Sequence, residues 1–214
     1  MSNRGTNRWA FLESVRATAF LLGGVIFVAN TALVAYNVVV GAEGPLILGQ
    51  AFVGAGWTAA FIGLLGVYPS LAARSRWPAR VGAVFAVIGA ITMAAMSVTS
   101  LGYVAGVLRG EFSQVVGVFL PGVFLGIILG FGTFGLTSLR SDVVTRNLGL
   151  LFLVLPLTFL FNLGTGIAGF NPLSKVLVVV GVLALTMLAI GYLFRTGGAL
   201  ENRQEMETSS SSGA

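Results

Sequence analysis

The chain has 214 residues, of which 56% are hydrophobic and only 9% are charged, and its formal net charge is +5. A mean hydropathy of +0.95 is typical of a chain that lies in a lipid bilayer and excludes an ordinary soluble domain. The absence of cysteine and histidine excludes disulfides, thiol nucleophiles, axial haem histidines and the common zinc sites. We therefore expect no cofactor and no metal site.

Six uncharged runs are long enough to cross a bilayer, whose core of about 30 Å needs about 20 apolar residues per helix. They are residues 17–40, 46–70, 81–104, 114–137, 148–169 and 176–194. Residues 1–16 before them are expected to be a cytoplasmic segment, and the Gly- and Ser-rich residues 195–214 a disordered cytoplasmic tail. The sequence predicts an all-α, polytopic transmembrane bundle with one six-span domain over residues 17–194.

Basic residues are concentrated on one side of these spans. With a cytoplasmic N-terminus, ten of the twelve lie inside, and only Arg109 and Lys175 lie outside. The loops that hold the principal topology determinants contribute Arg74, Arg76, Arg80, Arg140 and Arg146. Because cytoplasmic loops carry an excess of Arg and Lys, both termini are predicted to be cytoplasmic. The arginine bias and the abundance of Ala, Val and Gly favour a prokaryotic plasma membrane, and the positive charge is assigned to topology rather than to nucleic acid.

Two arginine-containing segments resemble each other. "RSRWPAR" (residues 74–80) and "RSDVVTR" (residues 140–146) are 66 residues apart, and the same offset aligns several glycines. Spans two and three would then be a helical hairpin repeated in parallel orientation as spans four and five. The alternative is a chance match in a chain rich in glycine and apolar residues.

Glycines recur every four residues in the fourth span, as Gly122, Gly126 and Gly130. Helices in lipid associate through close packing, which small residues at this spacing allow. We interpret the stripe as a packing face within the chain, and the alternatives are a pore lining or a homodimer seam. Pro121 and Pro156 also lie inside spans, where they are interpreted as kinks packed against neighbours, with a gate as the alternative.

Amides are the strongest polar groups within the spans. Asn30 lies near the middle of the membrane, whereas Asn37, Gln50 and Asn162 fall in its outer half, followed by Thr165 on the face of Asn162. They could line one outward-opening polar cavity. The favoured interpretation is that they form interhelical hydrogen bonds of about 0.6 kcal/mol each.

No Asp, Glu, Lys or Arg occupies the middle of a predicted span, which argues against a proton-coupled pump, a voltage sensor or a carboxylate-based hydrolase. The first hypothesis is a non-enzymatic structural, assembly or accessory membrane subunit with a membrane-protein partner or a second copy. The second is a small permease or channel for a neutral or weakly polar solute. A membrane-embedded lipid-modifying enzyme is least supported, because no acid, base and nucleophile are placed together.

Overall fold

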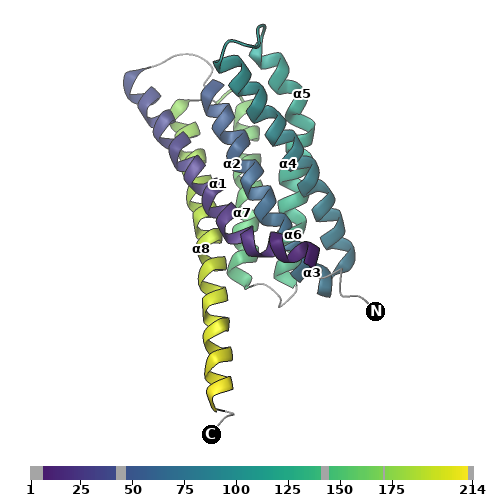
Figure 1. Ribbon diagram of the computed structural model, residues 1–214. Helices are drawn as coiled ribbons and strands as arrows, with labels where there is room; N and C mark the ends of the chain where they lie inside the picture. The colour runs from purple at the N-terminus through teal and green to yellow at the C-terminus, as the bar shows by residue number, and fades with distance from the viewer. Residues whose placement is uncertain (1–6, 42–46, 141–144, 171, 212–214) are drawn as a thin grey trace.

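The computed structural model describes residues 7–41, 47–140, 145–170 and 172–211, and this part of the chain is helical throughout apart from its connections (Figure 1). Six helices are long and apolar enough to cross a membrane. The predicted all-α transmembrane bundle with six spans is therefore confirmed.

The elements follow one another through short connections. Their bounds are α1 Asn7–Val40, α2 Ile47–Leu65, α3 Tyr68–Arg74, α4 Arg76–Val104, α5 Phe112–Phe124, η1 Leu125–Phe131, α6 Gly132–Arg140, α7 Arg146–Ile167 and α8 Leu173–Ser211. The segments α5, η1 and α6 form one continuous span, in which η1 is a π-helical stretch.

Several bounds differ from the sequence predictions, and three of the differences bear on the fold. The helix α1 begins at Asn7 rather than at residue 17, and its first turns run across one end of the bundle (Figure 1). The second predicted span ends at Leu65, because a separate helix, α3, begins with Pro69 in its first turn. The chain beyond residue 195 continues α8 as a helix to Ser211, where a disordered tail was predicted. Good helix formers between Ala199 and Glu207 outweigh the Gly and Ser content there.

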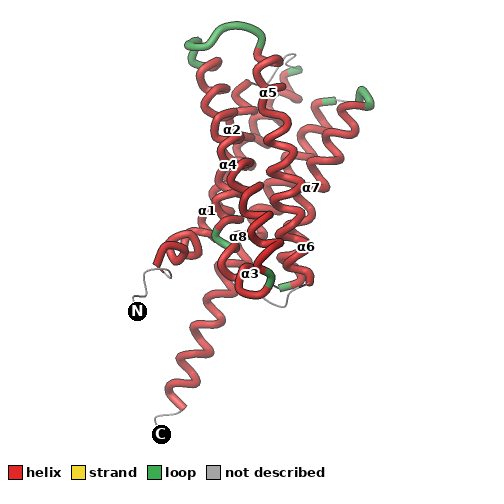
Figure 2. The backbone as a smooth tube through the Cα atoms, turned by 90° about the vertical axis from the view of Figure 1, so that its right-hand side faces the viewer, coloured by secondary structure: helices red, strands yellow, loops and turns green. Residues whose placement is uncertain are grey.

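Both chain termini lie at the same end of the bundle, together with α3 (Figures 1 and 2). We name this the terminal end, and the end that holds residues 105–111 and 168–170 the opposite end. An even number of spans requires this arrangement of the termini.

The spans form a closed ring in which each packs against its two neighbours. The helix α1 lies between α8 and α2, α2 packs on α4, α4 packs on the Phe112–Arg140 span, and α7 completes the ring between that span and α8. The contact between the Phe112–Arg140 span and α7 is made by η1 and α6. Within the described residues, α5 makes no extensive contact with α7 or α8.

The glycine stripe of the fourth span lies against α4. A Cβ atom on Gly126 would clash with Cα of Gly89, and one on Gly122 would overlap the side chain of Thr92. A Cβ atom on Gly130 would lie 3.4 Å from the backbone nitrogen of Ala86. These contacts join two helices of the same chain. The helices can approach so closely only because glycine has no side chain.

The π-helical stretch η1 follows Pro121 by one turn. Proline cannot donate a backbone hydrogen bond, so Pro121 leaves the carbonyl of Gly117, four residues earlier, without its helical donor. Inside η1, the hydroxyl of Thr133 donates to the backbone oxygen of Leu129. Pro156, by contrast, lies buried within an uninterrupted α7.

Aromatic side chains fill the centre of the ring. Phe61 and Phe131 have ring centroids 5.2 Å apart, and Trp57 meets the Phe131 ring edge-on at 5.6 Å. Phe152 continues the cluster from Phe131 at 6.4 Å and reaches Phe20 at 5.9 Å. All five are buried, so the bundle is closed at this level.

The helix bounds are compatible with the predicted repeat of a helical hairpin but do not test it. Shifting α2 and α3, which together run over 47–74, by 66 residues gives 113–140, close to the observed span Phe112–Arg140. Residues 141–144 of the second arginine segment lie outside the described residues. The duplication stays a prediction.

Candidate binding cavity

A cavity of about 270 Å³ lies between the spans, in the half of the bundle toward the opposite end. Its depth follows from its lining residues, because Gln50, Val116 and Val176 each lie within a few residues of the start of their helix at that end. All six spans contribute side chains to its wall.

The wall of the cavity is apolar except for two amides. Gln50 of α2 and Asn162 of α7 supply these, and the remaining lining residues are aliphatic, aromatic or methionine. Met93 and Met96 of α4 are among them, and methionine adapts to ligands of different shape. The described part of the wall holds no charged side chain. Such a surface suits a neutral molecule that is mainly apolar and carries one hydrogen-bonding group.

The cavity exists because the bundle packs tightly at one end only. The buried residues of α7 lie between Leu148 and Pro156, and none of the residues from Leu157 to Ile167 is buried. In α5 only Val123, near its end, is buried. Figure 2 shows the ends of α7 and α8 diverging from the neighbouring helices at the opposite end. The wall at Leu120 of α5 and Phe159 of α7 is therefore where the ring is least closed.

Trp57 forms the boundary between the cavity and the aromatic cluster. It lines the cavity, is only 2% exposed, and meets the ring of Phe27 edge-on at 6.0 Å. Phe61 and Phe131 lie behind it, toward the terminal end. The cavity is thus closed on that side by packed rings.

The structure brings together two of the five predicted cavity residues, Gln50 and Asn162. The side-chain amide of Asn37 donates to the backbone oxygen of Leu33 one turn earlier in α1, at 2.7 Å. The hydroxyl of Thr165 donates to the backbone oxygen of Phe161 at 2.6 Å. Neither of these residues lines the cavity, so their predicted placement there is corrected: each is satisfied by its own helix.

Asn30 lies elsewhere in the core. It is 2% exposed, and its side-chain carbonyl oxygen has no hydrogen-bond partner among the described residues. It does not belong to the cavity wall, which corrects its predicted place there. A buried carbonyl without a donor is costly, and this one lies on α1, which packs against α2 and α8.

The polar residue that sequence reasoning missed at this site is Lys175. It was counted as a charge on the outer side, yet it is only 7% exposed. Its ammonium group donates to the backbone oxygen of Phe170 at 2.9 Å, the hydroxyl of Thr165 at 3.1 Å and the backbone oxygen of Asn162 at 3.4 Å. It therefore joins the start of α8 to the end of α7 and holds the backbone at Asn162. The only sequence signal for this contact is the polar face of α7 that holds Asn162 and Thr165.

Gln50 is positioned by the close packing of α2 on α4. The hydroxyl of Ser97 donates to the backbone oxygen of Ala51 at 2.8 Å, which fixes the register of the two helices beside Gln50. A Cβ atom on Gly54 would lie 2.7 Å from the backbone oxygen of Met93, so α2 cannot carry a side chain there. Different hydrogen bonds to the backbone thus hold the helix at Gln50 and at Asn162.

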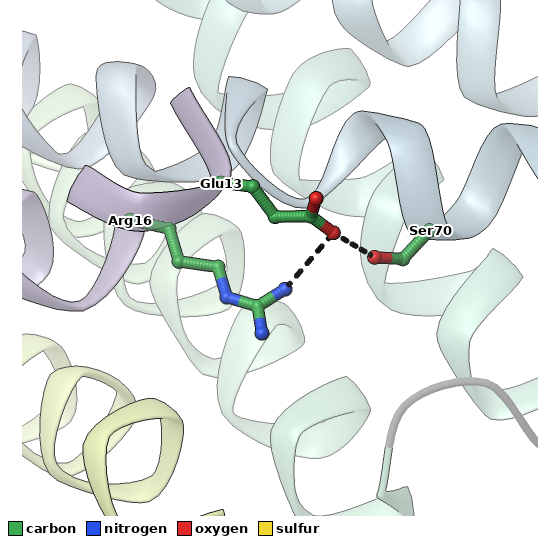
Figure 3. Close-up of polar contacts among 3 residues, drawn as sticks. All are labelled: Glu13, Arg16 and Ser70. Atoms are coloured by element: carbon green, nitrogen blue, oxygen red, sulfur yellow. Dashed lines mark hydrogen bonds and ion pairs between the residues drawn. The ribbon is translucent and has the colours of Figure 1, made fainter. Parts of the chain in front are cut away.

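The terminal end is tied together by a small polar cluster (Figure 3). Glu13 of α1 accepts a hydrogen bond from the hydroxyl of Ser70 at 3.1 Å and pairs with the guanidinium of Arg16 at 3.8 Å. That guanidinium also lies 4.8 Å from the ring centroid of Phe194 in α8. An exposed ion pair of this kind contributes about 0 to 1 kcal/mol, so the cluster orients α1 more than it stabilises the fold.

The five arginines predicted as topology determinants divide into two groups. Arg74 and Arg140 line a hollow of about 480 Å³ at the terminal end, and Arg76, Arg80 and Arg146 do not line it. All five are exposed.

The chain matches no protein-family model, no curated protein and no solved structure, so its function must be argued from its own residues.

Proposed function

We propose that this integral membrane protein binds a small, neutral, mainly apolar molecule between its six spans and serves as a permease for it. The observation that carries the proposal is the cavity of about 270 Å³, whose otherwise apolar wall includes Gln50 and Asn162. Each amide can both donate and accept a hydrogen bond, so the pair suits a hydroxyl, carbonyl or amide group on the solute.

The volume of the cavity limits the size of the solute. A buried apolar cavity of about 150 Å³ holds benzene, so this one fits a ring or short chain with a few additional atoms. An ion would lose its hydration without gaining an opposite charge from the described wall. The proposed substrate class is therefore a neutral amphiphile.

Passage across the membrane requires the aromatic floor to open. Phe131 is the last residue of η1, and it packs against Trp57 at the cavity boundary. A shift of η1 from π-helical to α-helical register would rotate this ring relative to Trp57. In this proposal the π-helical stretch is the moving part, which agrees with the frequent occurrence of π-helical turns at functional sites.

The proposed orientation places the terminal end in the cytoplasm of a prokaryotic cell, with the cavity toward the outer face. The arginine-rich loops at the terminal end support it. We propose a binding and transport role rather than an enzymatic one, and no part in binding nucleic acid.

A structural, assembly or accessory subunit is the second candidate function. It draws support from the exposed apolar face of α4, which includes Val84, Ile91 and Val98. Lipid tails, a membrane-protein partner or a second copy of the chain can cover this face.

Substitution of the cavity amides separates the two candidates. We expect short-chain and aromatic alcohols to raise the melting temperature of the purified protein more than hydrocarbons of the same size. Gln50→Leu and Asn162→Leu keep the side-chain volume but remove the hydrogen bonds, and each should weaken alcohol binding about three- to tenfold.

Asn37→Leu is the matched control, because it removes an amide at similar depth that bonds its own helix. It should leave alcohol binding unchanged. If no solute raises the melting temperature, or if all three variants lower binding equally, the permease proposal fails and the structural role is favoured.

A further inference from the structure

A second site is formed at the terminal end by the hollow of about 480 Å³. Arg74, Ser75 and Pro78 line it on one side, at the junction of α3 and α4. Thr137 and Arg140 of α6 line it on the other side. Two arginines from segments 66 residues apart therefore line one space.

The start of α4 borders this hollow. Ser75 is the N-cap residue of the 29-residue helix, and its side chain makes no capping hydrogen bond. The first backbone N–H groups of a helix have no acceptor within it, and Ser75 and Pro78 at this start of α4 line the hollow. Within the described residues, neither Arg74 nor Arg140 forms an ion pair with a carboxylate. The site is rich in donors for an anion.

An apolar groove of about 430 Å³ continues from this hollow toward the middle of the membrane. The two spaces share Thr133 and Leu136. Beyond these residues the groove runs between the Phe112–Arg140 span and α7, past Gly132 and Leu157. Leu136 and Leu157 are 51% and 63% exposed, so apolar side chains flank an open groove.

We propose that the hollow and the groove together bind one anionic glycerophospholipid. Its phosphate lies between Arg74 and Arg140, where each guanidinium can donate two parallel hydrogen bonds to it. One of its acyl chains lies along the groove, which a soluble anion would leave empty. This site is separate from the cavity at the opposite end and does not depend on the proposed transport function.

The site is more specific than the general attraction of basic loops for anionic lipid. Arg76, Arg80 and Arg146 lie at the same end and give that general attraction, but they do not line the hollow. Removing the two lining arginines and removing two others should therefore have different effects on lipid binding, although the net charge changes equally.

Native mass spectrometry of the purified full chain tests the proposal. The protein is incubated with phosphatidylglycerol or with phosphatidylcholine of the same acyl chains, and the bound lipid is counted. We expect phosphatidylglycerol to be retained in preference, and Arg74→Gln with Arg140→Gln to weaken its retention at least about tenfold, since each charge contributes about fivefold. The matched control, Arg76→Gln with Arg146→Gln, removes only the general attraction and should weaken retention clearly less.

A second pair of variants tests the groove. A Cβ atom on Gly132 meets no atom within 4 Å, so Gly132→Leu fills the groove without displacing the protein. It should reduce phosphatidylglycerol retention severalfold. Gly117→Leu is the control, because Gly117 is equally open, lies in the same span and borders neither space.

A third experiment adds inorganic phosphate at millimolar concentration, which should not displace the bound lipid. If phosphate displaces the lipid completely and Gly132→Leu binds phosphatidylglycerol as the wild type does, the ligand is a soluble anion and the lipid proposal is wrong. Equal retention of the two lipids, or equal loss in the two double-arginine variants, would contradict the site itself.

Discussion

Replacing Gly126 by leucine is expected to prevent the protein from folding into its six-span ring. The Cβ atom of the new side chain would clash with Cα of Gly89 on α4, and it would also lie 3.0 Å from the ring of Phe61. Neither a backbone atom nor a buried ring can move aside without separating the two helices. Overpacking of a close contact costs about 1 to 3 kcal/mol in ordinary cores and more where backbone meets backbone, so we expect a loss of at least about 3 kcal/mol. The yield of monodisperse protein after detergent extraction, and its melting temperature, measure the effect.

Gly117→Leu provides the control for this experiment. It makes the same chemical change in the same span, but a Cβ atom there meets nothing within 4 Å. We expect this variant to extract and melt like the wild type. A Gly126→Leu protein that behaved identically would show that the stripe is not buried against α4.

Replacing Trp57 by alanine is expected to have the second largest effect on stability. Trp57 is 2% exposed and packs against Phe27, Phe61 and Phe131, with ring centroids 5.6 to 6.1 Å away. Truncation of a buried tryptophan costs about 3 to 5 kcal/mol, because the surrounding side chains collapse only in part. It would also extend the cavity toward the terminal end. Thermal unfolding in one detergent measures the loss.

Trp77→Ala is the comparison for this variant. It removes the same kind of side chain from the surface, because Trp77 is 76% exposed. Its expected effect is within about 0.5 kcal/mol of the wild type. If the two alanine variants melt at the same temperature, Trp57 does not hold the centre of the bundle.

The spans could be predicted from the sequence because a helix in lipid needs only a long enough apolar run. Their ends could not be placed equally well. Leu65 is followed by residues as apolar as those before it, and the break there depends on Gly66 and Pro69 rather than on hydropathy. The tail beyond residue 195 was judged by its Gly and Ser content, whereas helix formation depends on the residues between them.

The cavity could be predicted only in part. Depth in the membrane follows from position along a helix, so the outer-half amides were recognisable as a group. Which of them meet depends on how each helix is rotated about its axis, and that is set by contacts such as Gly54 against Met93. Asn37 is satisfied within α1, and Lys175 is buried by the turn between α7 and α8. Neither outcome is encoded in hydropathy or charge.

The proposed permease requires that its solute reach the cavity from the outer face, and thiol labelling at position 162 tests this most directly. The natural chain has no cysteine, so Asn162→Cys carries a single thiol in the cavity wall. Ser100→Cys is the control, because Ser100 lies in the same half of the membrane and is completely buried outside the cavity. A small, membrane-impermeant thiol reagent added to intact cells should label Asn162→Cys and leave Ser100→Cys unlabelled. A cysteine at 162 that stays as unreactive as the one at 100, or that reacts only from the cytoplasmic side, would contradict this account.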